Sequence, residues 1–95
     1  MESCLSERCD ITVTIVNRLG LHARPAMAFV DVANEFKSAV TVTKDDQEVD
    51  GKSIMQVMLL AATQGTKLSI TARGPDASDA CKALKSLVDS GFSEE

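Results

Sequence analysis

The sequence predicts an α+β domain in which one sheet carries helices on a single face. Segments that alternate apolar and polar residues, as half-buried strands do, are interleaved with segments that carry apolar residues at helical spacing. The resulting order of elements is β-α-β-β-α-β-α. Because each predicted strand has only one apolar face, the helices are expected to pack against one side of one sheet.

Four strands are predicted from the alternation of apolar and polar residues. In the first, Ile11, Val13 and Ile15 alternate with polar residues, so one face of that strand is expected to be buried. Asp45 and Asp46 mark a tight turn between the two middle strands. The strands are predicted over 10–17, 38–43, 47–50 and 67–72.

Three helices are predicted from apolar residues that recur every three or four positions. Pro25 fits the first turn of the first helix, where its missing N–H costs nothing. Ser53 and Gln56 match the capping-box pattern S-x-x-Q, and Asp76 is expected to cap the last helix. The helices are predicted over 23–36, 53–62 and 76–88.

The composition is that of one small globular domain. The chain has 95 residues, a net charge of −4 and neither Trp nor Tyr, so binding of nucleic acid through phosphates or stacked bases is not expected. No apolar run is long enough for insertion into a membrane, and the N-terminus lacks the features of a signal peptide. We therefore expect a cytoplasmic protein with a flexible segment over 1–8 and a single domain over 9–95.

The three cysteines, Cys4, Cys9 and Cys81, are expected to be free thiols without an assigned role. An odd number without a CxxC motif argues against a disulfide framework, and Cys81 has the position of a small core residue. The chain has one histidine, and the spacing of the cysteines does not match that of metal ligands. No cofactor motif is present, so neither a metal nor a cofactor is expected.

The single histidine, His22, lies immediately before the first predicted helix, within the sequence GLHARPA at 20–26. First-turn N–H groups have no partner inside a helix and carry partial positive charge. Because Pro25 has no N–H, the amides of Ala23, Arg24 and Ala26 are expected to cradle an anion. A phosphoryl group on a ring nitrogen of His22 would be held by these amides and by the guanidinium of Arg24.

Residue type alone leaves another interpretation of His22 open. A single histidine before a helix is more often a surface residue or a hydrogen-bonding residue of a loop. The His-Ala-Arg-Pro order favours a functional role because it places a nucleophile, unpaired amides and a cation together. A Ser-His-Asp set cannot be argued, since the sequence does not place a carboxylate beside the ring.

The stretch 19–27 resembles the active-site signature of HPr, the histidine-containing phosphocarrier of the bacterial phosphoenolpyruvate-dependent phosphotransferase system, and the similarity extends over 11–88. The resemblance implies an HPr-like open-faced β-sandwich, with a four-stranded antiparallel sheet and three helices on one face. It also implies that His22 takes a phosphoryl group on Nδ1 from phospho-enzyme I and passes it to an enzyme IIA, with Arg24 as a stabilising neighbour. The protein would then be a covalent carrier, not an enzyme, and a monomer.

Ser53 has two interpretations. As the cap of the second helix it would stabilise that helix by ~1 kcal/mol and need no other role. The segment 51–55 also resembles the regulatory serine segment of HPr proteins that are modified by HPr kinase/phosphorylase. A phosphate there would oppose docking of phospho-enzyme I and make Ser53 an inhibitory switch, and it would allow a transcriptional regulator to bind.

The second predicted helix carries two apolar faces. These consist of Val57, Leu60 and Ala61, and of Ile54, Met55 and Met58. In one interpretation all six residues are core; in the other, the second face stays exposed because a short helix on a small sheet does not bury its whole circumference. Exposed Met and Ile form an adaptable docking patch, and the matching positions of HPr contact enzyme I and enzyme IIA. The expected partner-binding residues are Ala23, Arg24, Met27, Ile54, Met55 and Met58.

Two other functions stay open. In the first, the same chemistry serves a nitrogen-related regulatory branch, because Gly74-Pro75 and the ending at 89–92 resemble the NPr paralogue. In the second, the protein is a regulatory binding module that acts through phospho-Ser53 and carries no phosphate. Relatives of that second kind lack the active histidine, whereas His22 is present here. Acid-labile phosphorylation distinguishes a carrier from such a module.

Overall fold

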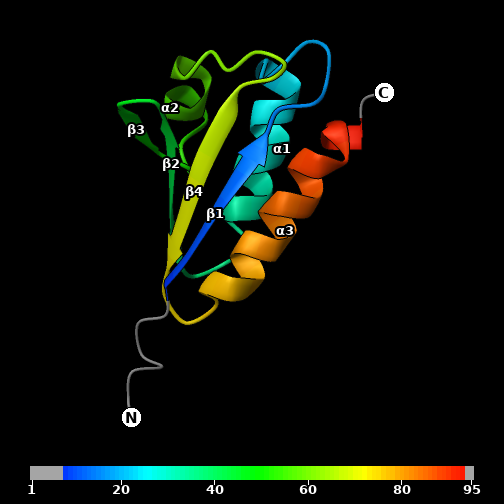
Figure 1. Ribbon diagram of the computed structural model, residues 1–95. Helices are drawn as coiled ribbons and strands as arrows, with labels where there is room; N and C mark the ends of the chain where they lie inside the picture. The colour runs from blue at the N-terminus through cyan, green and yellow to red at the C-terminus, as the bar shows by residue number, and fades with distance from the viewer. Residues whose placement is uncertain (1–7, 94–95) are drawn as a thin grey trace.

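The computed structural model describes residues 8–93, which form one four-stranded sheet with three helices on one face (Figure 1). The strands are β1 (Arg8–Thr14), β2 (Ala39–Lys44), β3 (Gln47–Asp50) and β4 (Lys67–Arg73). The helices are α1 (Ala23–Ala33), α2 (Ile54–Leu59) and α3 (Ala77–Asp89), followed by the 3-10 turn η2 (Gly91–Ser93). The predicted α+β class and element order are confirmed.

The sheet has the strand order β1-β4-β2-β3, and all neighbouring strands are antiparallel. Its register pairs Val13 with Leu68 and Val42 with Ile70, so apolar side chains from three strands lie on one face. Polar residues alternate with them and leave the other face to solvent. This arrangement confirms the expected open-faced sandwich.

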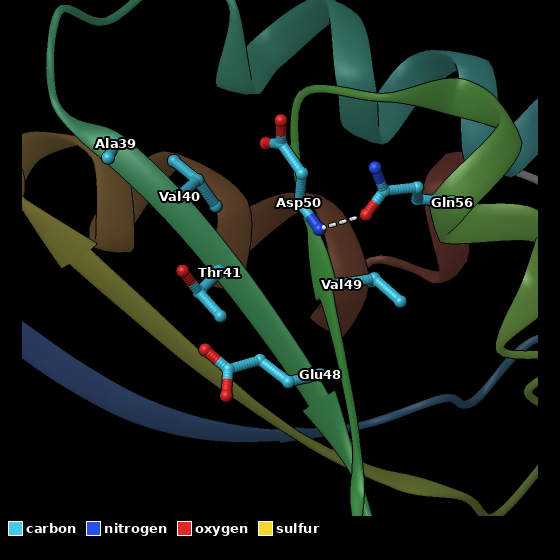
Figure 2. Close-up of a pocket in the computed structure, with 7 residues that line it drawn as sticks. All are labelled: Ala39, Val40, Thr41, Glu48, Val49, Asp50 and Gln56. Atoms are coloured by element: carbon cyan, nitrogen blue, oxygen red, sulfur yellow. Dashed lines mark hydrogen bonds between the residues drawn. The ribbon is translucent and has the colours of Figure 1, made fainter.

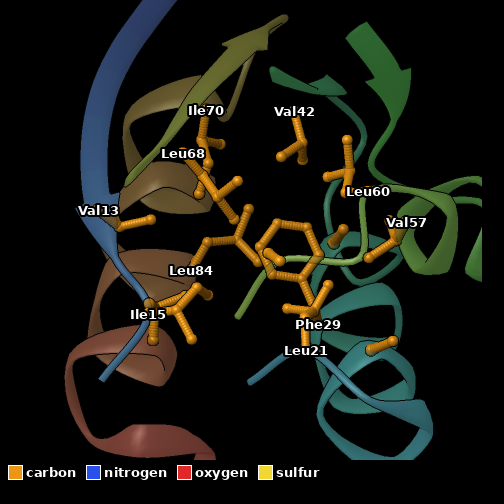
Figure 3. Close-up of a cluster of buried hydrophobic side chains, with 14 of the residues drawn as sticks. Val13, Ile15, Leu21, Phe29, Val42, Val57, Leu60, Leu68, Ile70 and Leu84 are labelled. Atoms are coloured by element: carbon orange, nitrogen blue, oxygen red, sulfur yellow. The ribbon is translucent and has the colours of Figure 1, made fainter. Parts of the chain in front are cut away.

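The hydrophobic core fills the layer between the sheet and the helices. Phe29 of α1 lies at its centre, with Leu21 and Leu84 beside the ring (Figure 3). The apolar side chains of α3 face the sheet: Ala80, Cys81, Leu84 and Val88 are buried, and Leu87 is partly buried. Since the core gathers residues from every helix, α1 is held firmly against the sheet, and so is the loop that leads into it.

The ends of several elements differ from the prediction. β1 ends at Thr14 because the chain turns at Asn17, and it begins at Arg8, which pairs with Arg73. The remainder of the segment expected to be flexible, 1–7, lies outside the described residues. α1 ends at Ala33, before the predicted position 36.

The largest difference concerns α2, which spans six residues instead of the predicted 53–62. The hydrogen bonds from Leu60 N to Val57 O (3.2 Å) and from Ala61 N to Met58 O (3.1 Å) are of the 3-10 type. Ala61 then adopts a φ of 48°, which ends the helix. Ala61 is consequently exposed, so its expected place on the buried face with Val57 and Leu60 is wrong.

Asp76 occupies the N-cap position of α3, but its carboxylate does not cap the helix. It accepts hydrogen bonds from Lys37 N (2.9 Å), Ser38 N (2.9 Å) and Ser38 Oγ (2.5 Å). The start of α3 is thereby tied to the segment that leads into β2. The hydrogen bond from the Ser38 hydroxyl, followed by that from the Lys37 amide, lowers the pKa of Asp76 from 3.8 to about 2.

Asp76→Asn is expected to make the free energy of unfolding less dependent on pH in acid. Because the pKa of Asp76 is lower in the folded protein, its contribution is complete above the unfolded value of 3.8 and disappears as the pH falls through about 2. The wild type should lose stability over this window, and Asp76→Asn should lose less. Urea titrations across the window measure the difference. Asp79→Asn, which removes an exposed carboxylate from the same helix, serves as the control, and equal slopes for wild type and Asp76→Asn would contradict the expectation.

Candidate functional site: a histidine at the start of a helix

His22 is the N-cap residue of α1, with extended backbone angles (φ −80°, ψ −169°) and a half-buried side chain. The imidazole makes no capping hydrogen bond to the first turn. The first turn also contains no acidic side chain, so none of its own carboxylates offsets the partial positive charge at this end of the helix. A negative group attached to the ring would therefore lie beside a favourable field.

Fewer backbone amides are available to bind an anion than the sequence predicts. The N–H of Ala26 donates to the carbonyl of His22 at 3.0 Å, which is the first hydrogen bond of the helix. The expectation that Ala26 helps to bind an anion is therefore wrong. Pro25 has no N–H, so the amides of Ala23 and Arg24 are the first-turn donors without an acceptor inside the helix.

The loop that carries His22 is fixed by neighbours on both sides. Asn17 is buried, and its Nδ2 donates to the Gly20 carbonyl at 2.8 Å, while Gly20 N donates to Asn17 O at 3.2 Å. The next amide, of Leu21, donates to Ala62 O at 2.8 Å. The position of the imidazole is thus determined by a closed turn and by the segment that follows α2.

Gly20 is required by this arrangement. Its φ is 69°, and a Cβ at this position would lie 2.5 Å from the Ala62 carbonyl oxygen and 2.9 Å from the Thr63 Cα. Asn17 and Gly20 were not among the predicted site residues. An asparagine and a glycine three residues apart, just before the histidine, are typical of a turn and could have indicated this one.

Ser53 is the N-cap residue of α2, and its Oγ accepts a hydrogen bond from Gln56 N at 3.3 Å. The reciprocal half of the predicted capping box is absent, because Gln56 Oε1 accepts from Asp50 N at 2.9 Å. Ser53 N donates instead to the Asp50 carbonyl at 3.1 Å. Its capping role is therefore present, and its side chain is half-buried at the edge of the helix.

His22 and Ser53 lie at opposite ends of α2. The hydrogen bond from Leu21 to Ala62 places the histidine loop beside the residues that follow α2, whereas Ser53 precedes its first turn. A six-residue helix is about 9 Å long, so about this length separates Ser53 from the end of α2 that leads to the histidine loop. The exposed side of α2 lies between these two ends.

Exposed apolar side chains occupy this surface on α1 and α2. They are Met27 (54 % exposed), Met55 (76 %), Met58 (42 %) and Leu59 (67 %), which together we call the docking surface. The two helices pack against each other, and Met27 lies one turn beyond exposed Ala23 on the same face of α1. Contiguous exposed methionines are typical of surfaces that adapt to several partners.

The exposed residues of α2 differ from the prediction at two positions. Ile54 is partly buried and packs against the core, so it contributes less surface than expected. Leu59 was not predicted, although it follows Met55 at the i+4 position that continues an exposed helix face. Arg24 and Ala23, in the first turn of α1, are exposed as partner-binding residues would be.

A hollow on the surface lies beside the start of α2. It is lined by β2, β3 and Gln56, and Figure 2 shows the hydrogen bond between Asp50 N and Gln56 Oε1 at one side of it. None of the predicted site residues lines this hollow. Within residues 8–93, no group of three or more His, Cys, Asp or Glu side chains could hold a metal ion, and no helix is both long and apolar enough to span a bilayer.

A family model described as "PTS HPr component phosphorylation site" matches residues 9–90. The chain belongs to the HPr family. The phosphocarrier protein HPr of Pseudomonas putida is 49 % identical over 83 residues, which are 86 % of this chain and 92 % of that protein. HPr of Neisseria meningitidis serogroup A is 46 % identical over 83 residues, 87 % of this chain and 93 % of the relative.

Solved HPr structures have the same fold. A crystal structure of HPr-C-His from Thermoanaerobacter tengcongensis superimposes with a TM-score of 0.88 at 45 % identity, covering 92 % of this chain and 98 % of that one. The sheet order and helix placement described above are therefore those of HPr proteins.

Proposed function

We propose that this HPr-family protein carries a phosphoryl group on His22 between phospho-enzyme I and an enzyme IIA. The observation that carries the proposal is the position of His22 at the N-cap of α1, where the Ala23 and Arg24 amides have no acceptor inside the helix. A fixed loop and an exposed docking surface accompany it. The protein reacts once with each partner and is regenerated by the next, so it is a carrier and not an enzyme.

In the proposed reaction, a lone pair on a neutral ring nitrogen of His22 attacks phosphorus in line with the bond to the phosphohistidine of enzyme I. The new P–N bond forms as the old one breaks, and the donor histidine leaves as neutral imidazole. The amides of Ala23 and Arg24 and the Arg24 guanidinium stabilise the charge on the phosphoryl oxygens. Transfer to an enzyme IIA follows the same path in reverse.

The proposal is tested by incubation with phosphoenolpyruvate and enzyme I. Intact-protein mass spectrometry should show the gain of one phosphoryl group, which brief acid treatment removes and alkali does not. The phosphorylated protein should then lose the group to an enzyme IIA. Absence of incorporation, or a modification that survives acid, would contradict a role as a histidine phosphocarrier.

Arg24→Ala is expected to slow phosphoryl transfer roughly tenfold without unfolding the domain, because a charge-assisted contact to the phosphoryl oxygens is lost at an exposed position. Single-turnover transfer from phospho-enzyme I measures the rate. Arg73→Ala removes the same charge at the end of β4, beside the start of β1, and should leave the rate unchanged. Equal rates for wild type and Arg24→Ala would remove Arg24 from the site.

The docking surface is proposed to bind both enzyme I and enzyme IIA. Met55→Lys places a charge on the most exposed of its side chains and should weaken both complexes by roughly tenfold in Kd, because a desolvated contact is replaced by a solvated cation. Isothermal titration calorimetry measures both affinities. Ser69→Lys adds the same charge on the polar face of the sheet and should change neither, and an unchanged affinity in Met55→Lys would contradict the proposed surface.

Ser53 is proposed as a regulatory phosphorylation site for HPr kinase/phosphorylase, with a transcriptional regulator as a further partner of the phosphorylated form. Its N-cap position supports this, since the first turn of α2 tolerates a negative group. The location beside Ile54 and Met55 supports an effect on docking. Incubation with ATP and the kinase should give an acid-stable modification that is absent in Ser53→Ala.

The pathway branch and setting are part of the proposal. The relatives described above are HPr proteins, which favours the sugar phosphotransferase branch over the nitrogen-related one. We propose a cytoplasmic monomer in that branch. Transfer rates to enzyme IIA proteins of both branches, measured side by side, distinguish the two, and faster transfer to the nitrogen-related acceptor would overturn this assignment.

A further inference from the structure

Two cysteine side chains lie together at the end of the molecule opposite the histidine loop. Cys9 is the second residue of β1, and Cys81 lies in the second turn of α3. Figure 1 shows that β1 and α3 both begin at the end of the sheet remote from the start of α1. The two cysteines are 72 residues apart in the sequence, so the fold alone brings them together.

The two cysteines are in direct contact. The thiol of Cys81 donates a hydrogen bond to the Cys9 carbonyl at 3.3 Å. Cys9 packs against the buried cluster that contains Cys81, because it points to the helix-covered face of β1 in alternation with exposed Arg8 and Asp10. Burial, followed by the interaction with the Cys9 side chain, raises the pKa of Cys81 to about 12.

The buried residues that share a cluster with Cys81 are small. They are Ala72, Ala77 and Ala80. The partly buried side chains that pack against this cluster are those of Cys9, Ile11 and Phe36. Cys9 is half-buried and Cys81 is buried, so an oxidant in solution reaches Cys9 first.

We propose that Cys9 and Cys81 form a site of reversible oxidation, at which a peroxide produces an intramolecular disulfide that joins β1 to α3. Cys9 is oxidised to the sulfenic acid as hydrogen peroxide is reduced to one water. The Cys81 sulfur then attacks the Cys9 sulfur, forms the S–S bond and releases a second water. Two thiols lose two electrons and two protons, and a thiol reductant restores them by exchange.

The link would act on stability and not on phosphoryl transfer. β1 is an edge strand whose only neighbour in the described sheet is β4, so its start is a place where the sheet can open. A bond between positions 72 residues apart removes much of the conformational freedom of the unfolded chain. Since His22 lies at the other end of the fold, its reactivity should not change.

The test uses the full chain with Cys4→Ser, so that Cys9 and Cys81 are its only thiols. Folded protein treated with hydrogen peroxide should lose the mass of two hydrogens, and peptide mapping should recover a Cys9–Cys81 link. Its Tm should rise by roughly 10 °C and return after treatment with dithiothreitol. Phosphoryl acceptance from enzyme I, measured on the same samples, should be equal before and after oxidation.

The control variants add Cys9→Ser or Cys81→Ser to this background. Each should gain oxygen at the remaining cysteine or stay unchanged, and neither should show a reversible rise in Tm. A link between two chains, or a link that forms in urea but not in the folded protein, would overturn the proposal. So would a folded, oxidised protein in which both cysteines carry oxygen and no S–S bond.

Discussion

Replacement of His22 by glutamine is expected to abolish phosphoryl acceptance from phospho-enzyme I, with a fall of at least ~1000-fold in rate. Glutamine is polar and similar in length, but its amide has no nucleophilic nitrogen that can form and later release a P–N bond. The chain has no other histidine to substitute for it. Mass spectrometry of the phosphoryl group that the variant takes up from phospho-enzyme I measures this loss of rate.

The fold of His22→Gln should stay intact. The backbone carbonyl of this position accepts from Ala26 N whichever side chain is present, and the imidazole does not cap the helix. The midpoint of urea unfolding should therefore remain close to that of the wild type. Lys82→Gln, on the exposed side of α3, controls for a surface substitution and should accept phosphate normally. Acid-labile phosphate on His22→Gln would contradict the proposed site.

Ser53→Asp is expected to lower the rate of His22 phosphorylation by roughly 10- to 100-fold, and phosphorylation of Ser53 should lower it further. The reason is the position of Ser53 beside the docking surface, about the length of α2 from the end that contacts the histidine loop. A negative charge there lies beside the surface proposed to bind enzyme I. It acts on the binding of enzyme I, so the effect should appear in the affinity of the complex.

Two controls separate this effect from loss of the helix cap. Ser53→Ala removes the hydroxyl that accepts from Gln56 N and should cost ~1 kcal/mol in the free energy of unfolding while the transfer rate stays the same. Ser69→Asp adds an equal charge on the polar face of the sheet and should not slow transfer. A slow Ser53→Ala variant would indicate that the cap, and not the charge, controls the reaction.

Patterns of local sequence were sufficient for most of the architecture. The alternation of Val40 and Val42 predicts a strand with one buried face, and both side chains are buried. Pro25 in the first turn and the apolar spacing up to Phe36 predict a helix over 23–36, which has the start of α1 but ends three residues after it. Local patterns succeed here because strand and helix periodicity is a property of neighbouring residues.

Some details of the candidate site follow from adjacent residues, and others depend on the rest of the fold. The order His-Ala-Arg-Pro predicts a reactive histidine at a helix start from four adjacent residues. The Ala26 amide, which was predicted to bind an anion, is used within the helix, and this too follows from helix geometry. Leu59 escaped prediction because whether a helix face is exposed depends on what the rest of the fold places against it.

By itself, the sequence determined the class of fold, the family and the single histidine that is proposed to carry a phosphoryl group, because these depend on residue type and short-range order. The tertiary structure decided that Gly20 abuts Ala62, that Asp76 binds Ser38 and that Cys9 meets Cys81. Asp76 and Ser38 are 38 residues apart in the chain, and Cys9 and Cys81 are 72 residues apart. Such contacts depend on how the helices pack on the sheet, and no local pattern contains that information.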